Sequence, residues 1–360
     1  MYITSDFKYD IPTDKPKTGS YEWWYFDAKD DSGHWSIVVI FYEGCPFSPR
    51  YNKMYDDGGS STASDHPAIS ISLYYDFKPV FYSMTEYKPQ DCSFKNDGDE
   101  IRIKVGDNFL FLRKSDGKLF HTLQLNEKMP SGDILEGLLH FESIHNPDLF
   151  TKKPEPGQHH WNLTQPRAMV NGILELKTGF GGFNRIYWKG KGYHDHNLGF
   201  EPMMNEFDDW YWGRFHYKAH TLVYYLMRKN GLLEIKGWLF DKKQNLLNVF
   251  EKGKIANEFN NLFGLTAATE IHLNYDSISC RIYQRNIVDK GPFYYRFIAE
   301  STLQRGNEVE RVFGFTEYIK PKNIHKKVYW PLINMRYHYK GEANWVQKSP
   351  IFYRWTWKGL

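Results

Sequence analysis

One stretch of the chain reads Gly-Tyr-His-Asp-His-Asn-Leu-Gly, and nowhere else are so many proton-handling groups placed so close together. The glycines at its ends and the mixed polar and apolar residues before it favour a strand that leaves a turn. Alternate side chains of a strand share a face. We therefore expect Tyr193, Asp195 and Asn197 on one face, and His194 and His196 on the other.

The two faces predict different chemistry. On the first, an apolar pocket would raise the pKa of the Asp195 carboxyl by desolvation and make it a possible general acid. On the second, the His-x-His pattern resembles half of a strand-borne metal site. Zinc needs a third and usually a fourth ligand, and the sequence places none beside this pair. We expect no metal, and we interpret His194 and His196 as structural supports.

Composition limits what this segment can belong to. A chain of 360 residues can bury one large core or two medium cores. The formal charge of +3 is nearly balanced, with basic residues scattered among acidic ones, so nucleic acid is not an expected partner. Cys45, Cys92 and Cys280 form no CxxC pair, which favours a reducing compartment. No stretch approaches the ~18 apolar residues of a membrane span, so we expect a cytoplasmic protein with at most peripheral membrane association. The oligomeric state is not readable.

Short segments with period-two alternation dominate the chain, and each is bounded by Gly, Asp or Asn. Aromatic residues, which favour strands, make up 18% of the chain. The expected strands include residues 69–74, 101–105, 109–113, 119–125, 221–227, 233–240 and 310–318. No long amphipathic helix with capping signals is present, so we predict an all-β protein built from antiparallel barrels or sandwiches.

An internal echo suggests two tandem domains. Residues 22–28, Glu-Trp-Trp-Tyr-Phe-Asp-Ala, lead through a turn into an apolar strand. Residues 209–215, Asp-Trp-Tyr-Trp-Gly-Arg-Phe, lead into another in the same way. Each pattern is typical of a tryptophan-rich first strand that opens a barrel. We predict an N-terminal domain at 1–205 and a C-terminal domain at 206–360. A proline-rich loop at 152–158 would precede the strand that carries the His-His-Trp motif.

Four motifs follow one another in the order expected of a known family: Glu-Trp-Trp-Tyr-Phe from residue 22, His-His-Trp from 159, the Tyr-His-Asp-His-Asn segment, and Trp-Tyr-Trp-Gly-Arg from 210. Together they resemble the carotenoid 1,2-hydratase family and its relatives with two lipocalin-like domains, which include fungal Diels-Alderases. The resemblance covers most of the chain. It implies two lipocalin-like antiparallel β-barrel or sandwich domains, with an apolar terpenoid, carotenoid or polyene held in or between them.

The resemblance also implies roles for particular residues. The family is implicated in cofactor-free, acid-catalysed addition of water to an isoprenoid double bond, through a His and a Trp of an HxW motif and the Tyr and Asp of YHD. These positions correspond to His159, Trp161, Tyr193 and Asp195, although His160 leaves the choice of histidine open by one residue. Substrate-binding positions are expected at Trp24, Tyr25, His160, Asn197, Trp212 and Arg214.

The mechanism implied is protonation of an alkene by Asp195, aided by Tyr193 or His159, with Trp161 stabilising the resulting cation through its π face. Capture by water gives hydration, and capture by another alkene gives cyclisation. Two other classes stay open: a pericyclic cyclase of the Diels-Alderase type that needs no proton transfer, and a non-catalytic carrier of an apolar ligand. Asp195 could also be a structural acid paired with Arg214, and the tryptophans also fit a place in a barrel core.

Overall fold

The computed structural model describes residues 1–98, 100–145 and 158–358, so most of the predicted 152–158 loop lies outside the described residues. The chain forms two compact units, one made of Met1–Pro202 with Trp330–Leu360 and the other of Met203–Tyr329. The predicted boundary near residue 205 lies close to this division. The prediction that 206–360 form one domain does not match it, because the C-terminal segment packs on the first unit.

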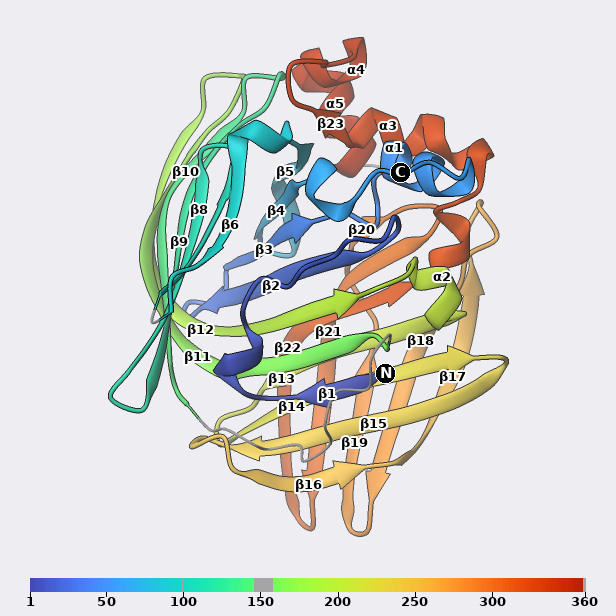
Figure 1. The fold of residues 1–360 in the computed structure, drawn as a ribbon. Helices are drawn as coiled ribbons and strands as arrows, with labels where there is room; N and C mark the ends of the chain where they lie inside the picture. Colours follow the sequence, from blue (N-terminus) through green and yellow to red (C-terminus); the bar gives the residue numbers. More distant parts are fainter. Residues whose placement is uncertain (99, 146–157, 359–360) are drawn as a thin grey trace. The chain divides into compact units, whose positions relative to one another are not determined.

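The first unit is built around one 13-stranded sheet. Its strands are β1 (Tyr2–Thr4), β2 (Tyr21–Asp30), β3 (Trp35–Glu43), β4 (Ala68–Tyr75), β5 (Lys78–Glu86), β6 (Cys92–Asn96), β7 (Glu100–Val105), β8 (Asn108–Ser115), β9 (Lys118–Lys128), β10 (Ile134–Ile144), β11 (His160–Lys177), β12 (Phe183–Gly199) and β23 (His338–Tyr339). The main path runs β23-β5-β4-β3-β2-β12-β11-β10-β9-β8-β7-β6, and β1 pairs with β11. All neighbours are antiparallel except β1 with β11 and β23 with β5. The sheet curls around the core, as Figure 1 shows.

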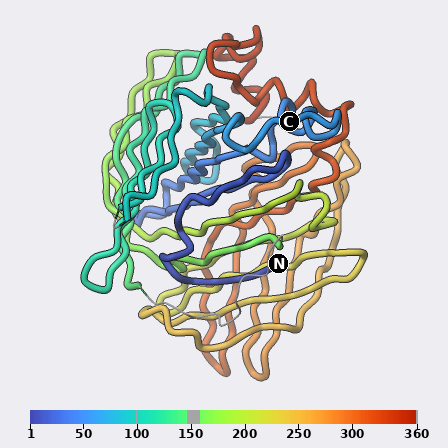
Figure 2. Tube along the Cα trace, in the orientation of Figure 1, coloured from blue at the N-terminus to red at the C-terminus, as the bar shows by residue number. Residues whose placement is uncertain are grey.

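Short helices accompany this sheet. They are the 3₁₀ turns at Phe7–Tyr9, Ala63–Asp65 and Pro89–Asp91, and α1 (Pro49–Asp56), α3 (Trp330–Arg336), α4 (Trp345–Lys348) and α5 (Pro350–Lys358). In the sequence, α3 precedes β23, and α4 and α5 follow it. Strand β23 pairs with Thr85 and Glu86 of β5. Figure 2 shows the return of the red C-terminal segment to the blue and cyan part of the trace. Tyr353 and Trp357 of α5 complete the core of the first unit.

The second unit contains a 10-stranded sheet. Its strands are β13 (Asp209–His216), β14 (His220–Lys229), β15 (Leu232–Asp241), β16 (Leu246–Phe250), β17 (Lys252–Asn260), β18 (Thr266–Tyr275), β19 (Ile278–Tyr283), β20 (Ile287–Lys290), β21 (Tyr294–Arg305) and β22 (Glu308–Ile319). Helix α2 (Met203–Glu206) and 3₁₀ turns at Pro321–Asn323 and Lys327–Tyr329 lie outside the sheet. The order is β16-β15-β14-β13-β22-β21-β19-β18-β17, with β20 beside β21.

The two units share one feature of their topology. In each, the tryptophan-rich strand lies mid-sheet, between the strand that follows it and a strand from much later in the chain: β2 between β3 and β12, and β13 between β14 and β22. Gly33, at φ +82°, closes the turn from β2 to β3 in a conformation that favours glycine. The predicted strands are confirmed, and the chain is an all-β protein with two lipocalin-like domains, each folded around its own apolar core.

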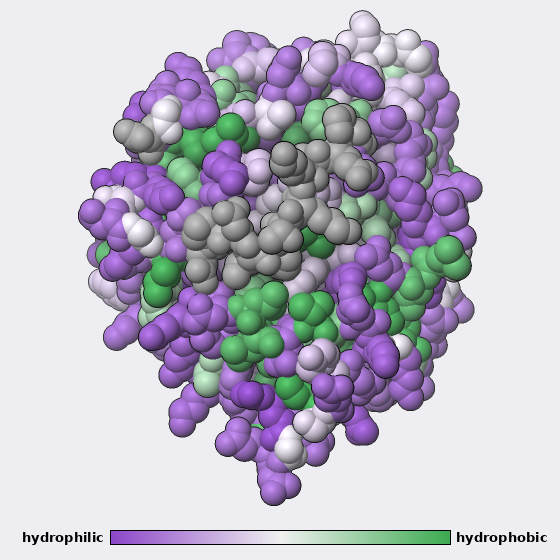
Figure 3. Space-filling model, turned by 60° about the horizontal axis from the view of Figure 1, so that its bottom comes forward, coloured by the Kyte–Doolittle hydropathy of each residue, from purple (hydrophilic) through white to green (hydrophobic). Residues whose placement is uncertain are grey.

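The face drawn in Figure 3 is mostly hydrophilic, and hydrophobic residues gather in a few places on it. Among the described residues, no helix has the length and apolar composition needed to cross a membrane.

Candidate active site on strands β2, β11 and β12

Strand alternation on β12 is confirmed. Register pairs Asp195 with Tyr25 of β2 and Asn197 with Trp161 of β11, so these four side chains share one face of the sheet, here called the Asp195 face. His194 pairs with Phe26, a member of the buried core, and so lies on the opposite face, here called the core face. Glycines let neighbours approach closely. At Gly199, for example, a Cβ would lie only 2.3 Å from the Tyr21 ring.

Asp195 is the centre of a hydrogen-bond network. The Nε1–H of Trp161 donates to Oδ2 at 2.8 Å, and the hydroxyl of Tyr193 donates to the same oxygen at 2.6 Å. The side-chain amide of Asn197 donates to Oδ1 at 2.8 Å. Asp195 is only 4% exposed, so these bonds form largely away from water. The structure thus brings together three of the four predicted catalytic residues and one predicted substrate-binding residue.

His159 joins the network through Asn197. Because the Asn197 amide nitrogen donates to Asp195, its oxygen accepts, and the Nε2–H of His159 donates to it at 3.1 Å. The hydroxyl of Tyr21 then donates to Nδ1 of His159 at 2.9 Å. Burial is the main reason that the pKa of His159 falls to about 3, so the ring is neutral. These contacts place His159, rather than His160, on the Asp195 face.

Other aromatic and apolar side chains complete this face. Trp23 stacks on Tyr21 with ring centroids 5.1 Å apart, and Tyr25 meets Tyr193 edge to face at 6.0 Å.

A fully buried acid on the Asp195 face was not among the predicted site residues. Asp27 lies directly across from Tyr193 in the β2–β12 register and therefore on the same face. Counting two residues along β2 from Tyr25 would have found it.

Two predicted substrate-binding residues do not lie on the Asp195 face. Trp24 is fully buried in the core, where it stacks on His196 with centroids 4.7 Å apart. His160 projects towards the N-terminal strand, and its Nε2 lies 2.7 Å from the hydroxyl of Thr4. Both placements have one physical cause: neighbouring residues of a strand point to opposite faces of the sheet, so Trp24 and Tyr25, or His160 and Trp161, lie on different faces.

The remaining two predicted binding residues belong to the second unit. Trp212 and Arg214 lie on β13, on the sheet face opposite that of Tyr211 and Phe215, which belong to the core of that unit. Both are buried. Their part in substrate binding stays a prediction.

On the core face, His196 is held between two acceptors. Its Nδ1 lies 2.8 Å from the carbonyl oxygen of Tyr9, and its Nε2 lies 2.9 Å from a carboxylate oxygen of Glu22. Neither partner can donate, so both ring nitrogens carry protons and the ring is a cation. Burial alone would lower the pKa of His196, but Glu22, followed by Asp10 and the Tyr9 carbonyl, outweighs burial and raises it.

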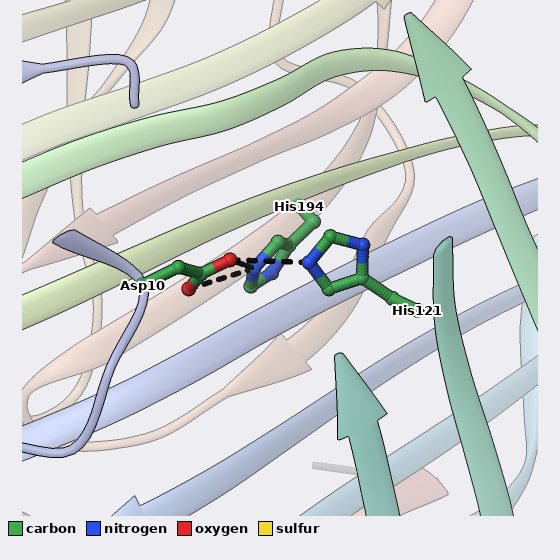
Figure 4. Close-up of side chains that lie close together, drawn as sticks. All are labelled: Asp10, His121 and His194. Carbon is green, nitrogen blue, oxygen red and sulfur yellow. Dashed lines mark hydrogen bonds and ion pairs between the residues drawn. The ribbon is translucent and has the colours of Figure 1, made fainter. Parts of the chain in front are cut away.

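His194 has the same kind of environment. Its Nδ1–H donates to the carbonyl of Tyr25 at 2.9 Å, and its Nε2–H donates to Asp10 at 2.9 Å. The Nε2–H of His121 donates to the same carboxylate at 3.1 Å (Figure 4). Burial opposes ionisation of Asp10, but His194 and His121 hold its pKa well below the usual range. Both histidines of the motif are thus buried and hydrogen-bonded on the core face, and their role as structural supports stays a prediction.

The buried charges around this pair balance. The ammonium of Lys15 lies 2.5 Å from Glu22 and 2.6 Å from Glu43. Three carboxylates thus face three cations: Asp10, Glu22 and Glu43 against Lys15, His194 and His196. Each charge lies within 2.9 Å of an opposite one, so attraction and hydrogen bonds offset part of the large cost of removing these charges from water.

Asp10, His121 and His194 form the one group of described residues whose ligand atoms are close enough to hold a metal ion. The donor set does not fit one well. A metal on Nε2 of His121 would force the remaining proton onto Nδ1, a buried atom with no hydrogen-bond partner. A divalent ion in place of the His194 proton would also leave an excess positive charge in a network that is now neutral. The geometry fits a protonated histidine better.

Three neutral buried histidines predict acid lability. Burial is the main cause that lowers the pKa of His121 to about 4, and of His159 and His160 to about 3, from 6.5. Groups with depressed pKa values take up protons on unfolding, so stability present above pH 6.5 is lost as the pH falls. Three such groups predict a loss of roughly 4 kcal/mol in the free energy of unfolding for each pH unit between about 6.5 and 4. Urea unfolding at several pH values measures this slope, and a flat profile would contradict it.

Comparison with known proteins finds a matching family model and several relatives. Residues 39–345 match the family model described as carotenoid hydratase CrtC. A hydroxyneurosporene dehydrogenase of Chlorobaculum tepidum is 28% identical over 329 residues, covering 86% of this chain and 85% of that protein. An acyclic carotenoid 1,2-hydratase of Thiocapsa roseopersicina is 28% identical over 209 residues, 58% of this chain and 47% of that protein.

A solved structure supports the fold. The crystal structure of CghA with Sch210972 superposes with a TM-score of 0.61 at 13% sequence identity, covering 84% of this chain and 89% of that chain. At this identity the likeness concerns the fold alone. The family match, which spans most of the chain and includes the strands that carry Trp161 and Asp195, is the stronger finding. The chain belongs to the carotenoid hydratase CrtC family.

Proposed function

We propose that this protein adds water to a carbon–carbon double bond of an acyclic carotenoid or a similar polyene, with Asp195 as the general acid. The observation that carries the proposal is the set of three donors on one buried carboxyl: Trp161, Tyr193 and Asn197. Family membership supports a hydratase-type activity. An acyclic carotenoid is the substrate class named for one relative.

The donors determine which oxygen of Asp195 would carry the transferable proton. Trp161 and Tyr193 both donate to Oδ2 and occupy its two lone pairs. In the protonated acid, the proton therefore resides on Oδ1. When it moves to an alkene carbon, the carboxylate that forms is already surrounded by oriented hydrogen-bond donors. Such preorganised donors stabilise charge as it develops, which is usually a large part of catalysis.

The rest of the reaction follows from the same face. Protonation of one alkene carbon creates a tertiary cation on the other, which the electron-rich ring of Trp161 stabilises. Water then forms the new C–O bond and releases one proton. Asp27, the second buried carboxyl on this face, is our candidate acceptor for that proton. His159 holds Asn197 in place through its Nε2–H and does not itself transfer a proton.

Isotope labelling tests this proposal. In D₂O, turnover of an acyclic carotenoid is expected to place one solvent deuterium on carbon, and in H₂¹⁸O one labelled oxygen in the product, because both new atoms come from water. Mass spectrometry of the product after washing with ordinary water distinguishes carbon-bound from exchangeable deuterium. A cyclic product without solvent deuterium would instead indicate pericyclic chemistry. Retained substrate without any turnover would indicate a carrier.

A further inference from the structure

The two C-terminal helices expose large apolar side chains. Trp345 of α4 is 69% exposed, and Ile351, Phe352 and Trp355 of α5 are 66%, 51% and 54% exposed. Phe180, in the turn between β11 and β12, is 58% exposed. These five residues are here called the C-terminal aromatic patch. Side chains of this size normally bury 150–250 Å² each in aromatic contacts, so a group of them in water indicates a binding surface.

Ring contacts link parts of the patch, and α5 is anchored on the first unit. The rings of Trp345 and Phe352 are 5.4 Å apart, and the guanidinium of Arg354 lies 4.7 Å from the ring of Phe180. On its other face, α5 buries Tyr353 in the core of the first unit, where the hydroxyl donates to the carbonyl of Tyr82 at 3.2 Å. Packing of the buried face of α5 therefore fixes the orientation of its exposed face.

The C-terminal segment that carries α4 and α5 has an excess of basic residues. Residues 330–358 contain five basic residues, Arg336, Lys340, Lys348, Arg354 and Lys358, and a single acid, Glu342. The whole chain has a formal charge of only +3, so the rest of the chain is slightly acidic. Arg354 pairs with Asp133, whereas Lys348 and Lys358, which follow Trp345 and Trp355 by three residues, are both exposed.

We propose that the C-terminal aromatic patch docks this protein on the surface of an anionic lipid bilayer. Tryptophan and phenylalanine insert at the boundary between headgroups and acyl chains, and flanking lysines pair with anionic headgroups. A protein partner with an acidic rim is the other class that fits, but the bulky apolar side chains exposed on a short surface helix suit shallow insertion. The purpose of docking, uptake of a bilayer-dissolved polyene, rests on the proposed function. The docking itself does not.

Vesicle binding tests the proposal without any substrate. The full chain is expected to co-sediment with vesicles of mixed phosphatidylcholine and phosphatidylglycerol, weakly with phosphatidylcholine alone, and less at high salt. Replacing Phe352→Ser and Trp355→Ser together is expected to lower the partition coefficient by about tenfold or more, because less apolar area enters the bilayer. In a second measurement on the unaltered chain, brominated lipids are expected to quench tryptophan emission, and quenching should fall in Trp345→Phe/Trp355→Phe.

A matched control keeps the result specific. Leu262, in the second unit, is fully exposed, and Leu262→Ser removes a similar apolar surface outside the patch. It is expected to leave vesicle binding unchanged. Equal loss in this control, or no loss in the patch variant, would overturn the proposal. So would a patch variant that dissociates a dimer in light scattering while vesicle binding persists. Circular dichroism confirms that each variant is folded, and activity on detergent-dispersed polyene separately tests the proposed function.

Discussion

Asp195→Asn is expected to lower kcat for hydration by about 10²- to 10⁴-fold, with a much smaller change in KM. The amide cannot deliver a proton to an alkene, yet it is nearly the same size as the carboxyl. Its oxygen can still accept the bonds that Trp161 and Tyr193 donate to Oδ2. Ground-state binding should therefore change little while transition-state stabilisation is lost. Product formation under single-turnover conditions measures the chemical step directly.

A second buried acid supplies the control for this experiment. Glu127 is fully buried in the first unit and accepts bonds from Thr85, Tyr87 and Asn108. Burial raises its pKa, as expected for an acid in the core. Glu127→Gln makes the same chemical change away from the Asp195 face and should leave kcat unchanged. If Asp195→Asn retains full activity, acid catalysis by this residue is refuted, and a pericyclic mechanism becomes the better account.

Glu22→Gln is expected to lower the free energy of unfolding by about 3–5 kcal/mol, the usual cost of removing one partner from a buried ion pair. Glu22 accepts from His196 at 2.9 Å and from Lys15 at 2.5 Å, and both cations are buried. The amide would leave the network with an uncompensated positive charge. Urea unfolding measures the loss. Near pH 6 the His196 contribution is fully present, because a raised pKa adds stability below the ordinary value of 6.5 and loses it as the pH rises through the folded value.

The matched control is a surface acid. Glu142, on β10, pairs with Lys118 at 2.5 Å, but both side chains are about half exposed. Exposed pairs contribute roughly 0–1 kcal/mol, so Glu142→Gln should cost little. Similar losses from both variants would show that the buried network has no special weight. A loss of kcat without loss of stability in Glu22→Gln would instead assign the core-face network a part in catalysis.

The division of β12 into two functional faces was predictable from the sequence. Alternation alone separated Tyr193 and Asp195 from His194 and His196, because strand geometry has a period of two and needs no tertiary information. The same rule, applied to the neighbouring motifs, would have put Trp24 and His160 on the face away from Asp195. Motif resemblance grouped residues by proximity along the chain, and the structure separates them by face.

Other parts of the site depend on pairings between residues far apart in the chain. Asp10 and Lys15 come from an N-terminal segment without periodicity, yet they meet residues of β12 and β2. Residues 330–360 join the first unit through the short parallel pairing of β23 with β5 and through burial of Tyr353 and Trp357 in its core. No local pattern encodes these contacts, because burial of charge and strand register are decided by what the whole sheet brings together.

The sequence by itself thus determined the all-β class, the repeated Trp-rich strand and the alternation that sets Asp195 apart from the histidines. Each follows from local periodicity and residue type. Only the tertiary structure decided that Trp161, Tyr193 and Asn197 all donate to Asp195. It also decided that a neutral cluster of buried charges packs against the core face of β12. These features depend on atomic distances across strands, which hydrogen bonds and desolvation energies require and which periodicity along the chain does not contain.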